Sequence, residues 1–200
     1  MAGWAVIGRI TPVAFGAIFA LSGAVAPILG QNFGARRFDR IAQTMRDSFI
    51  VVIVYVLVVW LLLALFRNQI SNAFGATGAA RELISFYCLF VAGSFLFNGM
   101  LFVANAAFNN LGFPLYSTLS NWGRSTLGVI PFVSLGASWY GATGALAGSG
   151  LGAVLFGLGA AIVCFRVIKD LERRNPPDAP APTPPAANSP FSSGKAATLG

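Results

Sequence analysis

The chain has 200 residues, of which 56% are hydrophobic and only 10% are charged, and the hydrophobic residues fall in long blocks. This composition is that of a membrane protein and excludes an ordinary soluble domain. The net charge of +7 does not indicate nucleic-acid binding, because most of the basic residues flank the apolar blocks, where they report membrane topology.

Five apolar segments each have roughly the 17–25 residues that a helix needs to cross a bilayer. Helices satisfy their own backbone hydrogen bonds inside hydrocarbon, so the sequence predicts an all-α, polytopic transmembrane bundle. The predicted spans are about 10–29, 49–66, 83–107, 115–135 and 142–167. The second span has no polar side chain besides Tyr55 and Trp60, and we expect it to be peripheral and to face lipid.

Basic residues predict the orientation of the bundle, because they are enriched in cytoplasmic connections. They crowd the connection after the first span and the segment after the last, which places both on the cytoplasmic side of a bacterial plasma membrane. Five crossings then put Met1 outside, which is awkward for a complete protein and natural for a fragment that lacks its upstream helices. The two basic groups are Arg36, Arg37, Arg40 and Arg46, and Arg166, Lys169, Arg173 and Arg174.

The predicted transmembrane domain covers residues 1–174. Residues 175–200 are rich in Pro, Ala and Ser, a composition that cannot bury a core. We therefore expect a disordered cytoplasmic tail at the C-terminus.

The first connection carries the most specific motif of the chain, which consists of Gly30, Gln31, Asn32, Gly34 and Ala35, followed by Asp39 and Arg40. It resembles the end of the second helix in a six-helix half of the multidrug and toxic compound extrusion (MATE) transporters. The resemblance continues through residues 122–132 and the glycine-rich last span, and covers about residues 2–174. It implies the last five helices of a twelve-helix transporter, with the N-terminal half as the missing partner.

The resemblance also implies a function. MATE transporters are secondary active antiporters that export amphipathic, often cationic, organic compounds in exchange for protons or sodium. They do so by alternating access between two helical halves. The expected partners are membrane lipids, a small organic substrate and the other half, with no nucleic acid and no cofactor besides the coupling ion.

Two interpretations of the motif are open. Gly30 and Gly34 are one helical turn apart, so another backbone can approach them, and Gln31 and Asn32 can bond carbonyls at a helix end. A plain helix-terminating turn explains these residues. A cytoplasmic hinge that docks on the other half explains them as well.

The third span carries a polar stripe with spacings of seven, four, seven and four, which places its members on one helical face. This face either packs on a neighbouring helix or, at Tyr87, Ser94 and Asn98, lines a central cavity. No Asp or Glu lies in the span, so an acid that couples transport to an ion would belong to the missing half. The stripe consists of Tyr87, Ser94, Asn98, Asn105 and Asn109.

Arg124 lies in the fourth span, about 15 Å along the helix from Pro114 at roughly 1.5 Å per residue. No acidic residue lies inside any predicted span to pair with it. Because an unpaired guanidinium is costly in hydrocarbon, Arg124 predicts a hydrated interior. It could bond carbonyls at a helix end or a polar residue of the same half. It could also form an electrostatic latch to an acid of the other half, or repel a positive charge and so tune a neighbouring carboxylate.

In the last span, Gly144, Gly148 and Gly152 are four residues apart and predict a close-packing helix face. The chain has no His and no membrane carboxylate pair, so we expect neither an enzyme nor a metal site, and Cys88 and Cys164 are interpreted as small core residues. Two alternatives to a drug exporter are a lipid or polysaccharide flippase of related fold and a structural or assembly subunit that transports nothing.

Overall fold

The computed structural model describes residues 2–175, and the regular structure in that range is helical. The all-α class predicted from the sequence is confirmed. The predicted tail lies, beyond Asn175, outside the described residues. The helices are α1 (Ala2–Gly34), α2 (Phe38–Ala73), α3 (Gly78–Phe86), α4 (Phe95–Asn110), α5 (Pro114–Gly123) and α6 (Ile130–Arg174).

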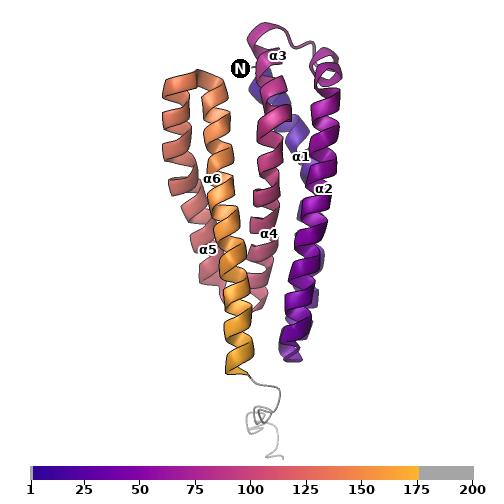
Figure 1. Ribbon diagram of the computed structural model, residues 1–200, viewed down its shortest axis with the longest axis vertical. Coiled ribbons are helices and arrows are strands. Elements are labelled where there is room, and N and C mark those ends of the chain that lie inside the picture. The colour runs from indigo at the N-terminus through magenta and orange to yellow at the C-terminus, as the bar shows by residue number, and fades with distance from the viewer. Residues whose placement is uncertain (1, 176–200) are drawn as a thin grey trace, which may run out of the picture.

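Two of the helical rods are continuous through short stretches of other helical geometry. A π-helix, η1 (Tyr87–Val91), and a 3-10 turn, η2 (Ala92–Ser94), join α3 to α4. A second π-helix, η3 (Arg124–Val129), joins α5 to α6. The rods therefore run from α3 into α4 and from α5 into α6 without a loop (Figure 1).

The prediction of five separate spans is wrong in one respect. The described residues form four helical runs that are long and apolar enough to cross a membrane, and the fourth, Pro114–Arg174, contains both the fourth and the fifth predicted spans. The connection expected between those spans is helical except at Gly141, whose φ of 60° and ψ of −135° reverse the chain. Glycine adopts such a backbone because it has no Cβ, and Figure 1 shows the two arms side by side.

The close contacts between the two arms define an antiparallel register. A β-carbon added at Gly144, Gly148 or Gly152 would overlap the carbonyl oxygen of Gly136, Phe132 or Gly128, respectively. Each step of four residues along one arm is thus matched by four in the opposite direction along the other. The three glycines allow the backbones of the two arms to touch, so the α5–α6 hairpin is packed closely against itself.

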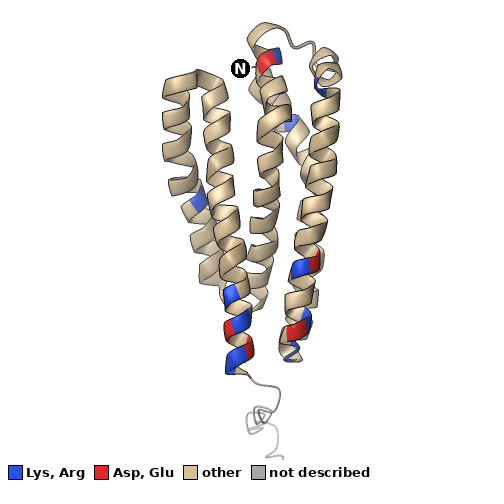
Figure 2. Cartoon of the chain, viewed as in Figure 1, with Lys and Arg blue, Asp and Glu red and all other residues tan. Residues whose placement is uncertain are grey.

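The charged residues lie near the ends of the rods, apart from one basic segment half-way along the α5–η3 arm (Figure 2). The α1–α2 and α4–α5 connections and the end of α6 lie at one end of the bundle, and the α2–α3 connection and the Gly141 bend lie at the other. The two predicted basic groups therefore share one end, as the orientation prediction requires.

The rod that contains α4 is the centre of the bundle, since it contacts α1, α2, α5 and α6. Phe15 of α1 stacks on Phe95 with ring centroids 4.1 Å apart, and Gly99 packs directly against Val52 and Ile18. The most deeply buried large side chains, including Phe108 and Leu101, belong to this core.

Helix α2 lies at the edge of the bundle, as expected for a peripheral span. Its outward face consists of exposed apolar side chains, among them Val54, Leu57 and Leu61. The two polar side chains of its apolar segment, residues 49–66, turn inward and bond backbone carbonyls: the Tyr55 hydroxyl donates to Ala14 over 2.7 Å, and the Trp60 indole N–H donates to Leu89 over 3.0 Å. The side-chain donors of Tyr55 and Trp60 are thus satisfied inside the bundle.

Candidate functional site

The predicted polar stripe of the third span is divided into two parts by η1 and η2. A π-turn adds a residue to a helical turn and so changes the direction in which the following side chains point. Spacings of seven and four keep residues on one face only in an uninterrupted α-helix. The two ends of the stripe contact different helices, because Tyr87 bonds Thr11 of α1 and Asn105 bonds Asn121 of α5.

Tyr87 bonds α1. Its hydroxyl lies 2.7 Å from the Thr11 hydroxyl, which itself donates to the Ile7 carbonyl over 2.8 Å. A threonine hydroxyl has one hydrogen, so Tyr87 is the donor to Thr11. Thr11 was not singled out in the sequence analysis, because nothing local in α1 indicates which residue of another helix it will meet.

Ser94 and Asn105 face the α5–α6 hairpin. Ser94 lines an open, otherwise apolar pocket of about 320 Å³ beside Gly150. Asn105 is buried, and its amide donates to the Asn121 side-chain oxygen over 3.1 Å. Asn109, the last residue of the stripe, is exposed.

Arg124 and Asn98 lie at the same depth in the bundle. Gly123 packs directly against the Phe156 ring, and a β-carbon added to it would lie 2.6 Å from that ring. Gly157, the next residue of α6, packs on the Phe97 carbonyl. Gly123 and Phe97 thus contact adjacent residues of α6, so their successors, Arg124 and Asn98, occupy one level.

Three buried polar atoms of α4 and η3 have no hydrogen-bond partner among the described residues: the Oδ1 atoms of Asn98 and Asn105 and the Nε atom of Arg124. The side chains of Asn98 and Asn105 are only 8% and 9% exposed. Arg124 has no ion-pair or hydrogen-bond partner within residues 2–175. Unpartnered buried polar atoms are rare in folded proteins. We call the four residues Asn98, Asn105, Asn121 and Arg124 the Arg124 cluster.

The Arg124 cluster borders an open polar face. Asn121 and Ser125, on either side of Arg124 along the rod, are exposed. An exposed polar face at this depth does not suit hydrocarbon, so it adjoins water or further protein. Leu119, Trp122 and Leu127 of the same rod are exposed and apolar and suit lipid.

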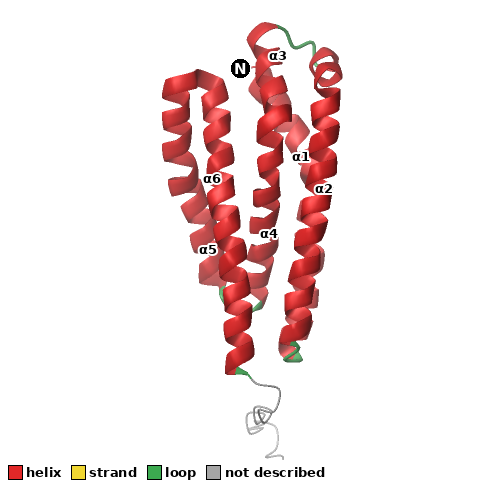
Figure 3. Ribbon diagram, in the orientation of Figure 1, coloured by secondary structure: helices red, strands yellow, loops and turns green. Residues whose placement is uncertain are grey.

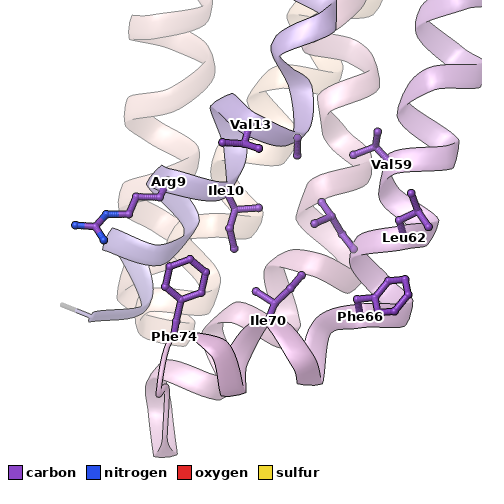
Figure 4. Close-up of a pocket in the computed structure, with 10 residues that line it drawn as sticks. Arg9, Ile10, Val13, Val59, Leu62, Phe66, Ile70 and Phe74 are labelled. Carbon is purple, nitrogen blue, oxygen red and sulfur yellow. The ribbon is translucent and has the colours of Figure 1, made fainter.

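A second open space is an apolar pocket of about 560 Å³ between α1 and α2, lined by Val13, Val59 and Phe74 among others. Arg9 belongs to its rim, and Figure 4 shows the guanidinium pointing away from the apolar side chains. Within the described residues, no group of His, Cys, Asp and Glu side chains suits a metal ion. Cys88 and Cys164 are buried and unpaired.

Helix α1 ends within the glycine motif, at Gly34, and a turn at Ala35 and Arg36 follows. Neither Gly30 nor Gly34 has a positive φ; Gly34 is the last helical residue, and it is Arg36 in the following turn that adopts the left-handed conformation, with φ 56°. The glycines thus belong to the last turns of α1, and the structure leaves open whether the motif only terminates the helix or also docks on another helical body. Gly30 lies against the Asn110 side chain of α4, and Gly34 borders open space.

The polar residues of the motif stay near the surface. The Asn32 amide donates to the Ile28 carbonyl over 2.8 Å, and the Gln31 carbonyl accepts from the Ala35 N–H over 3.0 Å. Asp39 is paired with Arg37 at 3.7 Å, and Arg40 is exposed. The motif forms an exposed corner of the bundle at the end that carries the predicted cytoplasmic charges.

Comparison with known proteins decides the family, because the profile of the MatE family matches residues 1–135. The chain belongs to the MatE family. An uncharacterized 21 kDa protein from the 5′ region of iaaL in Pseudomonas savastanoi is 33% identical over an alignment of 181 residues, which covers 86% of this chain and 57% of that protein. The FAD transporter of Shewanella oneidensis is 24% identical over 164 residues, or 82% of this chain and 36% of the transporter.

Solved MATE structures share the fold. The Vibrio cholerae MATE transporter VcmN in its bent form superimposes with a TM-score of 0.80 at 21% identity, covering 86% of this chain and 39% of VcmN. An inward-facing multidrug resistance MATE family transporter gives a TM-score of 0.76 at 18% identity, again over 86% and 39%. The resemblance inferred from the motifs is confirmed. The chain spans 57% and 36% of these curated relatives and about two fifths of these transporters.

Proposed function

We propose that this MatE chain forms one helical body of a secondary active transporter, which exports amphipathic organic compounds in exchange for protons or sodium. The observation that carries the proposal is the Arg124 cluster, a set of unpartnered polar groups at membrane depth beside an exposed polar face. A sealed bundle gains nothing from such groups. The exposed Asn121 and Ser125 beside them suit the wall of an aqueous cavity.

The proposed cavity lies between this body and a second one. Alternating access in transporters of this kind is largely a rigid-body motion of two halves about a site near the bilayer midplane. The backbone contacts of Gly144, Gly148 and Gly152 make the α5–α6 hairpin stiff, which suits such a motion. The exposed corner at Gly34 is the proposed contact with the other half.

We place the transporter in a bacterial inner membrane with the C-terminus cytoplasmic. Arg36, Arg37, Arg40 and the basic residues after Arg166 support this orientation, because they lie at one end of the bundle (Figure 2). Positive charge in short connections marks the cytoplasmic side.

The charge of the substrate has two candidate answers. The motif resemblance predicts cations, whereas the Shewanella relative is a transporter of FAD, a dinucleotide with an anionic pyrophosphate. Arg124 favours the second answer, since an unpaired guanidinium repels a cation at its own depth.

A structural subunit that packs on a partner through the glycines of α6 is less well supported. Gly144, Gly148 and Gly152 already contact carbonyls of the preceding arm, so this face is occupied by the chain itself. A flippase would typically use several basic residues in its cavity, and Arg124 is the only charged residue between Pro114 and Phe165.

The proposal is tested by measuring substrate accumulation in cells. We expect the longest open reading frame that contains this chain to give efflux that stops when the proton and sodium gradients are collapsed, and the 200 residues expressed alone to give none. Absence of gradient-dependent efflux from the longest frame would contradict the transporter. Seven further apolar spans encoded upstream of Met1 would favour it over the subunit.

A further inference from the structure

The apolar groove between α1 and α2, with Arg9 at its rim, belongs to other helices than the polar face of the proposed cavity. We infer that this groove binds an anionic phospholipid, whose acyl chain lies along the apolar side chains and whose phosphate lies on Arg9. The inference goes beyond the proposed function and does not rest on it, because it needs only a chain that spans a membrane.

The groove crosses the boundary between hydrocarbon and water. The apolar run of α2 ends at Phe66, and Arg67 follows it. Val59 and Leu62 line the groove within that run, whereas Phe74 lines it beyond Arg67. A phospholipid crosses the same boundary, with its acyl chains in the hydrocarbon and its phosphate at the interface.

Arg9 lies near the level of that boundary. The Tyr55 hydroxyl of α2 donates to the Ala14 carbonyl of α1, which places Ala14 beside the apolar run of α2. Arg9 precedes Ala14 by five residues, or roughly 7.5 Å at 1.5 Å per residue, toward the end of the bundle that holds the α2–α3 connection. Figure 4 shows its guanidinium pointing away from the apolar side chains, as a basic side chain does when it reaches from hydrocarbon to the interface.

The charge at this end of the bundle favours an anion. Basic residues mark the cytoplasmic side, and the two basic groups that do so lie at the other end, so topology does not account for the arginines here. Arg67 and Arg81 each donate to a neighbouring oxygen, whereas Arg9 has no hydrogen-bond or ion-pair partner within residues 2–175. The charged side chains at this end of the described range are Arg9, Arg67, Arg81 and Glu82.

The two halves of the groove together select the occupant. A guanidinium can pair with two oxygens of a phosphate, and such charge-assisted pairs are stronger than neutral hydrogen bonds. A soluble anion would leave the apolar side chains without a partner, and an uncharged lipid would leave Arg9 without one. A phospholipid with a net negative charge satisfies both.

Photocrosslinking from the wall of the groove identifies its occupant. Phe66 lines the groove and is half exposed, so benzoylphenylalanine in its place extends the ring without adding a charge. The control is the same replacement at Phe90, which is exposed and lines an uncharged pocket beside α6. The longest reading frame that contains this chain is reconstituted in vesicles of phosphatidylglycerol and phosphatidylcholine in equal amounts, with the same acyl chains, and mass spectrometry identifies the adducts.

We expect the ratio of phosphatidylglycerol to phosphatidylcholine adducts to be about fivefold higher at position 66 than at position 90, the factor for one arginine near an anionic surface. Arg9→Gln lowers the ratio at position 66 to that at position 90, and Arg9→Lys retains most of the preference. The matched control is Arg81→Gln, which removes a charge at the same end outside the groove and leaves the ratio unchanged. Arg9 and Arg81 are both exposed, so neither change disturbs the core.

A second pair of variants tests the apolar part of the groove. Val13 lines the groove and is 85% exposed, so Val13→Trp fills the groove without disturbing the core. We expect this change to lower the yield of lipid adducts at position 66 severalfold. Val54→Trp, on the outward face of α2, leaves the yield unchanged.

Equal ratios at positions 66 and 90 in the otherwise native protein would overturn the inference, as would an unchanged ratio in Arg9→Gln. Adducts from position 66 to protein in place of lipid would also overturn it, since another helix or a second copy would then cover the groove. An unchanged yield in Val13→Trp would show that the acyl chain does not lie in the groove, with the same consequence.

Discussion

At the scale of single residues, the polar groups of this bundle fall into satisfied and unsatisfied sets. Tyr55, Trp60 and Tyr87 each donate a hydrogen bond to a group of another helix. Asn98 and Arg124 retain buried atoms without partners. The first set stabilises the fold. We assign the second set to function, because burying a polar atom without a hydrogen bond costs free energy and gives the fold nothing in return.

Replacement of Asn98 by leucine separates these roles. The change removes a buried acceptor without a partner, so we expect unchanged thermal stability or a gain of about 1 kcal/mol, together with a severe loss of transport by the longest reading frame. Thermal unfolding in detergent and substrate accumulation provide the two measurements. Lower stability with unchanged transport per folded molecule would favour a packing role.

Replacement of Tyr87 by phenylalanine is expected to destabilise the bundle by about 0.5–1.5 kcal/mol, because it removes the donor to Thr11. Tyr116→Phe is the matched control, since Tyr116 is exposed and its hydroxyl has no partner in the described range. Equal melting temperatures for the two variants would show that the Thr11 bond does not stabilise α1 against the central rod.

At the scale of elements, hydropathy locates each rod, while its internal geometry depends on packing. The π-turn at η1 exposes a carbonyl, at Leu89, that accepts the Trp60 indole N–H, and Gly93 leaves room for the indole ring. The spacing of polar residues in the sequence does not reveal this turn, because it is interpreted with regular α-helical geometry. Only the packed structure shows that Tyr87 of the predicted stripe bonds Thr11 of α1, while Asn105 bonds Asn121 of α5.

The hairpin of α5 and α6 provides a test at this scale. Gly152→Ala places a β-carbon on the Gly128 carbonyl, and we expect it to lower the free energy of unfolding by about 1–3 kcal/mol through overpacking. Gly159→Ala, in the same helix with open space around it, is expected to stabilise the helix by up to about 1 kcal/mol. The melting temperatures of the two variants provide the measurement. Equal melting temperatures would mean that the two arms can move apart without a cost in stability.

At the scale of the whole molecule, the exposed surface has two characters. Most of it is apolar, as in α2, and suits lipid. The face with Asn121 and Ser125 is polar at similar depth in the bundle. A bilayer accepts only the first, so the second marks the side on which we place water and the other helical body.

Thiol labelling distinguishes these two surfaces. Ser125 and Leu127 are both exposed and two residues apart, and we expect Ser125→Cys to react with a membrane-impermeant maleimide far faster than Leu127→Cys. Each unit by which an apolar environment raises the pKa of a thiol lowers its reactive thiolate about tenfold. The experiment uses the longest reading frame with Cys88 and Cys164 changed to alanine; similar rates at both positions would argue against an aqueous cavity.

The sequence by itself determined the helical class, the places of the apolar rods, the end that carries the basic residues and the family. The class, the rods and the basic end follow from composition and charge along the chain, which act locally through the transfer of side chains between water and hydrocarbon, whereas the family follows from the resemblance of the motif at Gly30 to Arg40. Only the tertiary structure decided that Gly141 folds two spans into one hairpin, that Tyr87 meets Thr11, and that Asn98 and Arg124 share a level. Those facts depend on which helix faces pack together, and that is set by contacts between residues far apart in the chain.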